Sequence, residues 1–410
     1  MKILWVKAGG LVPPDLGGRI RSYQILRQLA AKHEVTLFTF YAAQSPDPHP
    51  ELKTEFHEVL YWPLAIPSDR SFRELFRFAL QVSRSWPYSV SKYCRQEVIA
   101  ALQKHLSERR YDLIVCDFVF AAGAIPWKIA CPKVLFTHNV EALIWQRHAQ
   151  VSRNPLWKLV AWGEYQKMLR FERFCLERSQ HVLAVSEADR AFFTRFVDLA
   201  KITVVPTGVD TEYFSARKVT EHRDSLVFTG AMDWMPNEDG ILYFVRSILP
   251  LIRKEIPGVT LTIAGRNPSG KLRAAVAADN KIEVTGKVED IRPYVHKSSV
   301  YVVPLRIGSG TRLKIFEAMA MGKAIVSSTL GAEGLPVSHG RELLIADSPQ
   351  EFAGAVVCLL RDRQQRARLG SAARQLVEER HSWRMVAAEV DGVLQRIVDQ
   401  QLAVYAGSHG

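Results

Sequence analysis

Short apolar runs alternate with longer amphipathic segments along most of the chain. In the first half, five apolar runs bounded by turn residues predict buried strands at residues 1–6, 34–40, 113–115, 133–137 and 181–186. Residues 21–31 and 96–109 have the hydrophobic spacing of helices. Buried strands that alternate with helices are typical of a parallel sheet covered on both faces.

The same alternation begins again after a polar, charged stretch at residues 215–224. It predicts helices at 239–256 and 312–321, and strands at 225–229, 259–264, 281–285, 300–304, 324–328 and 343–345. We therefore expect an α/β protein with two Rossmann-like, doubly wound parallel-sheet domains facing across a cleft, the usual place for a ligand.

The restart also predicts the domain bounds. Residues 1–214 form the first domain, 215–224 a linker and 225–381 the second domain. Residues 382–410 contain a long amphipathic helix at 382–405, which either packs on the second domain or crosses back to the first. A length of 410 residues agrees with two domains, because one hydrophobic core rarely supports so long a chain.

The charge balance points to an anionic partner. The formal net charge is +12 at pH 7, which suits nucleic acid, an acidic membrane surface or a phosphorylated small molecule. A solvated basic surface without a partner is the alternative. The five cysteines form no C-x-x-C pair, which predicts free thiols in a reducing compartment and no zinc site. The first residues are too short an apolar run for a signal peptide, and no stretch is apolar enough to span a membrane, so the expected location is the cytoplasm.

The segment YVVPLRIGSGTRLKIFEAMAMGKAIVSS at residues 301–328 carries the clearest chemistry. A strand, a Gly-Ser-Gly turn and a helix beginning near Thr311 form an anion site, because unpaired N–H groups and the helix dipole face the ligand. Arg312 and Lys314 add two cations, which a bound anion would compensate. Glu317 can accept hydrogen bonds from a ribose. The alternative is a plain strand–turn–helix unit with a surface glutamate.

The ordered motifs resemble the retaining glycosyltransferase family four. The run FEAMAMGKAIVSS resembles its nucleotide-sugar site, VVPTGVDTEYF the segment before its interdomain linker, and DLGGRIRSYQILRQLA its glycine loop and first helix. VLFTHNVEALIW and VLAVSEADRAFF resemble two further strand ends of the first domain. TGAMDWMPNEDG and LTIAGRNPS match a subgroup linked to polysaccharide and cell-envelope synthesis. The resemblance covers nearly the whole chain.

This resemblance implies the GT-B fold and a metal-independent transfer from a nucleotide sugar with retention at the anomeric carbon, without a cofactor. Glu317 would hold the ribose, and His138 would form a hydrogen bond near the donor sugar. The expected catalytic residues are His138, Arg312 and Lys314. The expected donor-binding residues are Gly17, Gly18, Gly230, Gly286, Lys287, Val288, Ser309, Gly310, Thr311 and Glu317, among which Gly17 and Gly18 approach the diphosphate and Gly286–Val288 meet the base.

Two departures from the family pattern matter. Ser309 stands where the family has the first of two glutamates, and the usual Arg and Lys pair after the first strand of the second domain is absent. We therefore predict that Arg312 and Lys314 supply the charge at the diphosphate, and that replacing both with alanine abolishes turnover while folding is kept. His138 has a bland alternative as a surface or capped residue. Asp233 and Asn237 either face the cleft or cap a helix.

Two basic, aromatic stretches at residues 71–95 and 143–178 suit an anionic membrane surface and a lipid-linked acceptor. Ordinary amphipathic helices with aromatic core residues are the alternative. The expected partners are thus a nucleotide-sugar donor, a glycan or lipid-linked acceptor and the inner face of the membrane, without nucleic acid.

Other functions fit less well. A nucleotide-sugar epimerase of the same architecture needs acidic cleft residues that we do not find. A basic nucleic-acid-binding protein explains the charge but not the ordered motifs. A dehydrogenase is disfavoured because no G-x-G-x-x-G follows the first strand.

Overall fold

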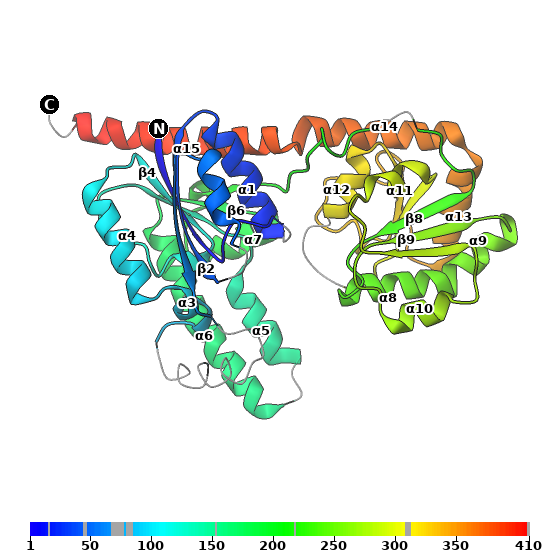
Figure 1. Cartoon of the computed structure of the whole chain (residues 1–410), viewed down its shortest axis with the longest axis horizontal. Coiled ribbons are helices and arrows are strands. Elements are labelled where there is room, and N and C mark those ends of the chain that lie inside the picture. The colour runs from blue at the N-terminus through cyan, green and yellow to red at the C-terminus, as the bar shows by residue number, and fades with distance from the viewer. Residues whose placement is uncertain are drawn as a thin grey trace. The chain divides into compact units, whose positions relative to one another are not determined.

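The computed structural model describes residues 1–14, 17–43, 47–66, 78, 85–151, 154–216, 219–307 and 313–407. The chain forms two compact units (Figure 1). The first unit comprises Met1–Pro206 together with Val386–Gly410, and the second unit comprises Thr207–Met385.

The first unit is built on a seven-stranded sheet with the order β3-β2-β1-β4-β5-β6-β7, in which every described pair is parallel. The strands are β1 (Lys2–Ala8), β2 (Glu34–Ala42), β3 (Glu58–Leu64), β4 (Leu113–Asp117), β5 (Lys133–Phe136), β6 (His181–Ala184) and β7 (Ile202–Val204). The five predicted strands are confirmed, whereas the edge strands β3 and β7 were not predicted. The order reverses between β1 and β4, where sheets of this kind bind ligands at the carboxyl ends of the strands.

The helices of the first unit lie on both sides of this sheet (Figure 1). They are α1 (Gly17–Ala30), α3 (Tyr88–Tyr93), α4 (Gln96–Glu108), α5 (Glu141–Val151), α6 (Pro155–Arg178) and α7 (Glu187–Phe193). The helix α6 begins after Asn154, whose side chain accepts hydrogen bonds from the N–H groups of Leu156 and Trp157.

The second unit contains a six-stranded parallel sheet with the order β10-β9-β8-β11-β12-β13. Its strands are β8 (Ser225–Thr229), β9 (Thr260–Ala264), β10 (Ile282–Gly286), β11 (Val300–Val303), β12 (Ala324–Ser327) and β13 (Leu344–Ile345). All six were predicted from their apolar runs. The order reverses between β8 and β11, so this sheet too has a point suited to ligand binding.

The helices of the second unit are α8 (Met235–Tyr243), α9 (Leu249–Glu255), α10 (Gly270–Val276), α11 (Arg292–Lys297), α12 (Leu313–Ala320), α13 (Pro349–Arg361) and α14 (Arg363–Arg380). The predicted helix at 239–256 is observed as α8 and α9 joined by a π turn at Phe244–Ile248. Pro250 has no N–H to donate to the turn before it, which favours a change of hydrogen-bond pattern here. No helix in the described part of the chain is long and apolar enough to cross a membrane.

Residues 207–214 group with the second unit, although the sequence analysis placed them in the first domain. Val209 N–H donates to the His381 carbonyl over 2.7 Å, and the Arg374 guanidinium donates to the carbonyls of Thr211 and Phe214 over 3.0 and 2.8 Å. These bonds fasten the segment to the end of α14, which lies far along the chain.

The C-terminal helix α15 (Trp383–Gly407) begins in the second unit and belongs to the first unit from Val386 onward. Within the first unit, the Asp391 carboxylate accepts hydrogen bonds from Lys32 over 3.1 Å and pairs with His33 over 2.6 Å. The helix therefore continues from one unit into the other.

Candidate functional site

A buried ion pair lies at the carboxyl ends of β1 and β4 in the first unit. Lys7 Nζ is 3.1 Å from Asp117 Oδ2, and both side chains are nearly inaccessible to water. Trp5 Nε1 donates to the same carboxylate over 2.7 Å. Burial opposes ionisation of Asp117, but the Lys7 charge together with the contacts of His138 and Ser22 outweighs it and holds the pKa of this carboxyl well below its usual range. A buried ion pair of opposite charges therefore lies at the switch point of the sheet.

His138 completes this network from the end of β5. Its Nε2 lies 2.7 Å from Asp117 Oδ1, and its Nδ1 lies 3.3 Å from an Arg21 guanidinium nitrogen. Since arginine can only donate, Nδ1 accepts and Nε2 carries the proton that goes to Asp117. Burial lowers the pKa of His138 to about 4, despite the Asp117 charge. The imidazole is therefore neutral at pH 7, with both nitrogens engaged inside the protein.

The predicted hydrogen bond from His138 to the donor sugar requires a change in the contacts of the ring. The ring is 5% exposed, so the alternative of a surface histidine is wrong. It can offer a hydrogen bond to a sugar only if its contact with Asp117 or Arg21 is given up. As it stands in this structure, the ring fixes the carboxylate and the guanidinium relative to each other.

Gly17 and Gly18 are the first residues of α1, whereas the sequence analysis placed them in a glycine loop before a helix at 21–31. A Cβ at Gly18 would lie 3.6 Å from His138 Nδ1, an ordinary contact distance, so the glycine rests directly against the imidazole. The Gly18 carbonyl accepts from Ser22 Oγ over 2.9 Å, and Ser22 accepts in turn from Lys7 Nζ over 2.9 Å. The structure therefore brings together the two features of the first unit that the sequence singled out.

In the second unit, Lys314 reaches across from α12 to the end of β8. Its ammonium group donates to the Thr229 carbonyl over 2.8 Å and to Asn237 Oδ1 over 2.6 Å, and it lies 4.2 Å from the centre of the Phe228 ring. These contacts make Lys314 a structural cation as well as a candidate phosphate contact. The expectation that its replacement by alanine leaves folding intact is therefore not supported.

Glu317 lies one turn further along α12. Its side chain is half-buried, and its carboxylate accepts no hydrogen bond from the described residues. Burial raises the pKa of Glu317 to about 7, against the opposing charge of Lys314. A carboxylate that is partly desolvated without protein donors is suited to accept hydrogen bonds from ligand hydroxyls.

Gly230 forms a tight turn beside these groups. A Cβ there would lie 2.6 Å from the Asn237 side-chain nitrogen and 3.0 Å from Lys314 Nζ, and a Cβ at Gly265 would lie 1.9 Å from the Gly230 carbonyl oxygen. The backbone at this strand end can be approached closely only because both positions are glycine. Gly230, Lys314 and Asn237 thus form one cluster.

The structure rules out one role that the sequence analysis left open for Asp233 and Asn237. The residue at the N-cap of α8 is Trp234, so neither Asp233 nor Asn237 caps the helix. Asn237 instead donates to the Ala231 carbonyl over 2.9 Å while it accepts from Lys314. Asp233 accepts from Asn267 over 2.8 Å.

Gly286, Lys287 and Val288 lie at the end of the edge strand β10, two strands from β8. Gly286 has a φ of 71°, which favours glycine, and Lys287 is exposed. Four predicted residues, Ser309, Gly310, Thr311 and Arg312, fall outside the described residues, so their roles stay predictions.

Sequence reasoning missed Lys7, Arg21 and Asp117. A charged residue inside or directly after an apolar run is the signal that marks Lys7 and Asp117, because a buried charge requires a partner. For Arg21 the predicted helix gave no such signal. In the described residues no group of three or more His, Cys, Asp or Glu side chains is placed to hold a metal ion.

Two family models match the chain in order. A model described as "Glycosyltransferase Family 4" matches residues 17–213, and one described as "Glycosyl transferases group 1" matches residues 223–362. Together they cover most of both units.

Individual relatives agree with these models. The chain is 23% identical to an uncharacterized 44.6 kDa protein in the cps region of Klebsiella pneumoniae, over 87% of this chain and 90% of that protein. It is 27% identical to a GDP-mannose-dependent alpha-(1-6)-phosphatidylinositol monomannoside mannosyltransferase of Mycobacterium tuberculosis, over 50% of this chain and 58% of that protein.

A solved structure shares the fold. The crystal structure of Anabaena Alr3699/HepE in complex with UDP aligns with a TM-score of 0.67 at 16% identity and covers 97% of this chain and 100% of that one. Because the two models follow each other along the two sheet-based units, and the architecture matches over nearly the full length, the chain belongs to the family 4 glycosyltransferases with the GT-B fold.

Proposed function

We propose that the protein moves a hexose-type sugar from a nucleotide-diphosphate sugar to a glycan or lipid-linked acceptor in polysaccharide or cell-envelope synthesis. The observation that carries this proposal is Glu317, a partly buried carboxylate that accepts no hydrogen bond from the part of the chain that the structure describes. It lies one turn from Lys314, which is bonded to Asn237. In this proposal residues 225–381 bind the donor, residues 1–214 bind the acceptor, 215–224 is the linker and 382–410 crosses back.

We propose a protein partner for each part of the nucleotide-sugar donor. Glu317 accepts hydrogen bonds from the ribose hydroxyls, while Arg312 and Lys314 neutralise the diphosphate. The Gly230 turn and residues 309–311 bring backbone N–H groups to the phosphates and the sugar, as glycine-rich turns do. Residues 286–288 contact the base through the backbone. From the first unit, Gly17 and Gly18 contribute their N–H groups.

The chemistry requires stabilisation of the charge that leaves with the diphosphate. Fixed cations and N–H donors aimed at that charge lower the barrier because they need no reorganisation during the reaction. We propose that the leaving phosphate accepts the proton of the acceptor, so that the anomeric configuration is retained without a second carboxylate at the position of Ser309. His138 acts in this scheme near the donor sugar, after its ring gives up the contact with Asp117 or with Arg21.

Nucleotide binding tests this proposal first. A thermal-shift panel of UDP, GDP, ADP and their sugar conjugates should show one nucleotide that stabilises the protein, by about 2.7 kcal/mol at 100 times its dissociation constant. The name of the Mycobacterium relative includes GDP-mannose, and the Anabaena structure contains UDP. Both nucleotides are therefore the first to try. No stabilisation by any of them contradicts the proposal.

The reaction itself is tested with the donor that binds. NMR of the product should show the same anomeric configuration as the donor sugar, and an excess of EDTA should leave the rate unchanged. A product with inverted anomeric configuration would contradict retention. Activity that is lost to EDTA and restored by a divalent cation would contradict metal independence.

We propose further that the protein acts in the cytoplasm, at the inner face of the membrane. In helix α6, Leu156, Leu159 and Trp162 are 74%, 71% and 48% exposed, and Lys158 between the two leucines is exposed as well. Apolar and aromatic side chains beside lysines favour an anionic lipid surface. In the other predicted stretch, 71–95, residues 71–77 and 79–84 fall outside the described residues.

Vesicle flotation tests the membrane part. Wild-type protein should float with anionic vesicles, whereas Leu156→Ser with Leu159→Ser should not. Leu199→Ser is the matched control, because Leu199 is 57% exposed elsewhere on the first unit. If the double variant floats as well as the wild type, or if the wild type does not float, the proposed membrane binding is contradicted. We assign no nucleic-acid partner, and steep salt-dependent DNA binding in a gel shift would overturn that assignment.

A further inference from the structure

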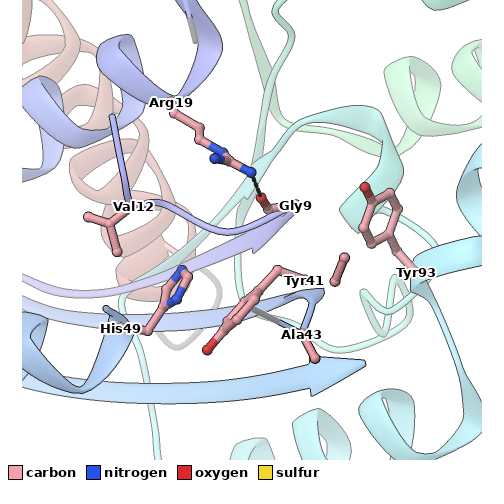
Figure 2. A pocket seen from close by; sticks show the side chains of 8 residues that line it. Gly9, Val12, Arg19, Tyr41, Ala43, His49 and Tyr93 are labelled. Carbon is pink, nitrogen blue, oxygen red and sulfur yellow. Dashed lines mark hydrogen bonds between the residues drawn. The ribbon is translucent and has the colours of Figure 1, made fainter. Parts of the chain in front are cut away.

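A cavity of about 250 Å³ lies in the first unit where β1 and β2 end. Its lining includes Gly9 after β1, Tyr41 and Ala43 at the end of β2, His49, Arg19 from α1 and Tyr93 from α3 (Figure 2). All of these belong to one unit, so the cavity is a property of the first unit alone.

One wall is a fixed aromatic pair. The rings of Tyr41 and His49 stack with centroids 3.7 Å apart and planes at 17°. Asp47 accepts from the Tyr41 hydroxyl over 2.6 Å and from His49 Nδ1 over 2.8 Å, while His49 Nε2 accepts from Leu11 N–H over 3.2 Å. These bonds satisfy both rings, so the wall is rigid before any ligand arrives.

The backbone beside this wall is shaped by glycine. Gly10 has a φ of 77°, and a Cβ there would lie 2.9 Å from His49 Nε2. Gly9 has a φ of 86°, and a Cβ there would lie 4.0 Å from the Tyr93 hydroxyl. Tyr93 therefore faces Gly9 across the space, on the other side from the Tyr41–His49 pair (Figure 2).

Arg19 gives the cavity its charge. A guanidinium nitrogen donates to the Gly9 carbonyl over 3.0 Å, which orients the group at the edge of the space. Burial lowers the pKa of His49, and the Arg19 charge lowers it further although Asp47 opposes this, so the imidazole is neutral. None of the described lining residues is acidic. Arg19 is therefore the cation among the described lining residues, while the Asp47 carboxylate outside the lining is bonded to Tyr41 and His49.

The size restricts the ligand. Sites for drug-sized molecules measure roughly 300–1,000 Å³, so this space suits one sugar ring or the end of a longer chain. Aromatic walls favour the C–H faces of such a ring, and an arginine fork favours a carboxylate or phosphate. Both features converge on a sugar that carries a negative charge.

We infer that this cavity binds an anionic sugar unit of the acceptor, either a uronate or a sugar phosphate, with Arg19 on the anionic group and Tyr93 against the ring. The inference rests on the proposed function in one respect, namely that the bound sugar is part of the acceptor. Binding of the sugar itself can be measured without any nucleotide-sugar donor. It names a charged substrate class for the first unit.

The test is calorimetry on the full chain with four probes: glucuronate, glucose 1-phosphate, glucose and inorganic phosphate. One or both anionic sugars should bind more tightly than glucose and than phosphate. Arg19→Met should weaken that binding roughly 10- to 100-fold, the usual range for losing a hydrogen bond to a charged group. Arg110→Met removes an exposed arginine of the same unit and should change nothing.

Two further variants separate the ring contact from folding. Ala43→Leu fills the cavity from an exposed position, so it should block binding while the thermal midpoint is kept. Tyr93→Leu should weaken binding, and Tyr93→Phe should restore most of it. Glucuronate that binds alone identifies a carboxylate ligand, and glucose 1-phosphate that binds alone identifies a phosphate ligand.

Other outcomes overturn the inference. If glucose binds as tightly as the anionic sugars, the negative charge of the ligand is not recognised. If inorganic phosphate binds as tightly as glucose 1-phosphate, the sugar ring is not recognised. If Arg19→Met and Ala43→Leu bind the anionic sugars as wild type does, the ligand does not bind in this cavity. UDP titrated in parallel keeps the two proposals apart. If UDP binds and no sugar does, the inference fails alone. If an anionic sugar binds as described and no nucleotide does, the proposed function fails alone.

Discussion

The carboxylate of Asp117 lies 3.1 Å from the ammonium of Lys7 and 2.7 Å from the imidazole of His138, inside the first unit. Replacing Asp117 with asparagine leaves the Lys7 charge buried without its counter-ion. We expect a loss of about 3–5 kcal/mol in the free energy of unfolding, which urea denaturation measures.

Glu108→Gln is the matched control for Asp117→Asn, because Glu108 has only a surface partner in Lys104. Its effect should stay below about 1 kcal/mol. An Asp117→Asn variant that is as stable as this control would show that the buried Lys7 charge does not depend on Asp117 as its counter-ion.

The protonation of His138 gives a second prediction. Its pKa of about 4 in the folded protein lies below the value of 6.5 in an unfolded chain. The unfolded state therefore binds more protons between these values, so the stability contributed by neutral His138 is complete above about pH 6.5 and is lost as the pH falls to about 4. NMR of the imidazole nitrogens should show a proton on Nε2 alone from pH 7 down to about 5. A ring that titrates near pH 6.5 contradicts this.

Lys314 offers a third prediction, on stability. Lys314→Met removes the donor to the Thr229 carbonyl and to Asn237, so the free energy of unfolding should fall by about 2–4 kcal/mol. Lys254→Met, at an exposed position of α9, should change it by less than about 0.5 kcal/mol. If the two variants are equally stable, Lys314 does not clamp the strand end and is available for phosphate alone.

The fourth prediction compares two helical glycines, Gly370 and Gly354, which differ in how closely other atoms approach them. A Cβ at Gly370 in α14 would lie 2.0 Å from the Gly322 carbonyl oxygen, whereas a Cβ at Gly354 in α13 meets nothing within 4 Å. Gly354→Ala should stabilise the protein by about 0.5–1 kcal/mol through its better helix propensity. Gly370→Ala should destabilise it by about 1–3 kcal/mol, because the backbone must move. Thermal unfolding of both variants checks the pair, and the same sign for both would refute the close approach.

The strands that carry the candidate site could be predicted because apolar runs with turn residues at their ends are local signals. The helix that carries Lys314 and Glu317 was predicted from a local pattern too, the hydrophobic spacing of residues 312–321. The edge strand β3 was missed because Pro63 interrupts its pattern, as edge strands tolerate. The three-residue strand β7 is too short to show a period.

Contacts between distant residues could not be predicted. The Lys314 partners Thr229 and Asn237 lie 85 and 77 residues away along the chain, and the Trp5 partner Asp117 lies 112 residues away. No local pattern indicates such pairs. For the same reason the sequence did not show that residues 207–214 are fastened to α14, or that both nitrogens of His138 are already bonded.

Nucleotide titration of wild-type protein and Glu317→Gln tests the central claim most directly. Burial raises the pKa of Glu317 to about 7, above the value of 4.5 in an unfolded chain, so ionised Glu317 costs stability as the pH rises through this window. The glutamine variant should therefore be more stable than wild type at pH 8, by about 1 kcal/mol for a half-buried group. It should also bind the preferred nucleotide roughly tenfold or more weakly, because the ribose loses a charged acceptor. A glutamine variant that binds UDP, GDP and ADP as wild type does would contradict the account.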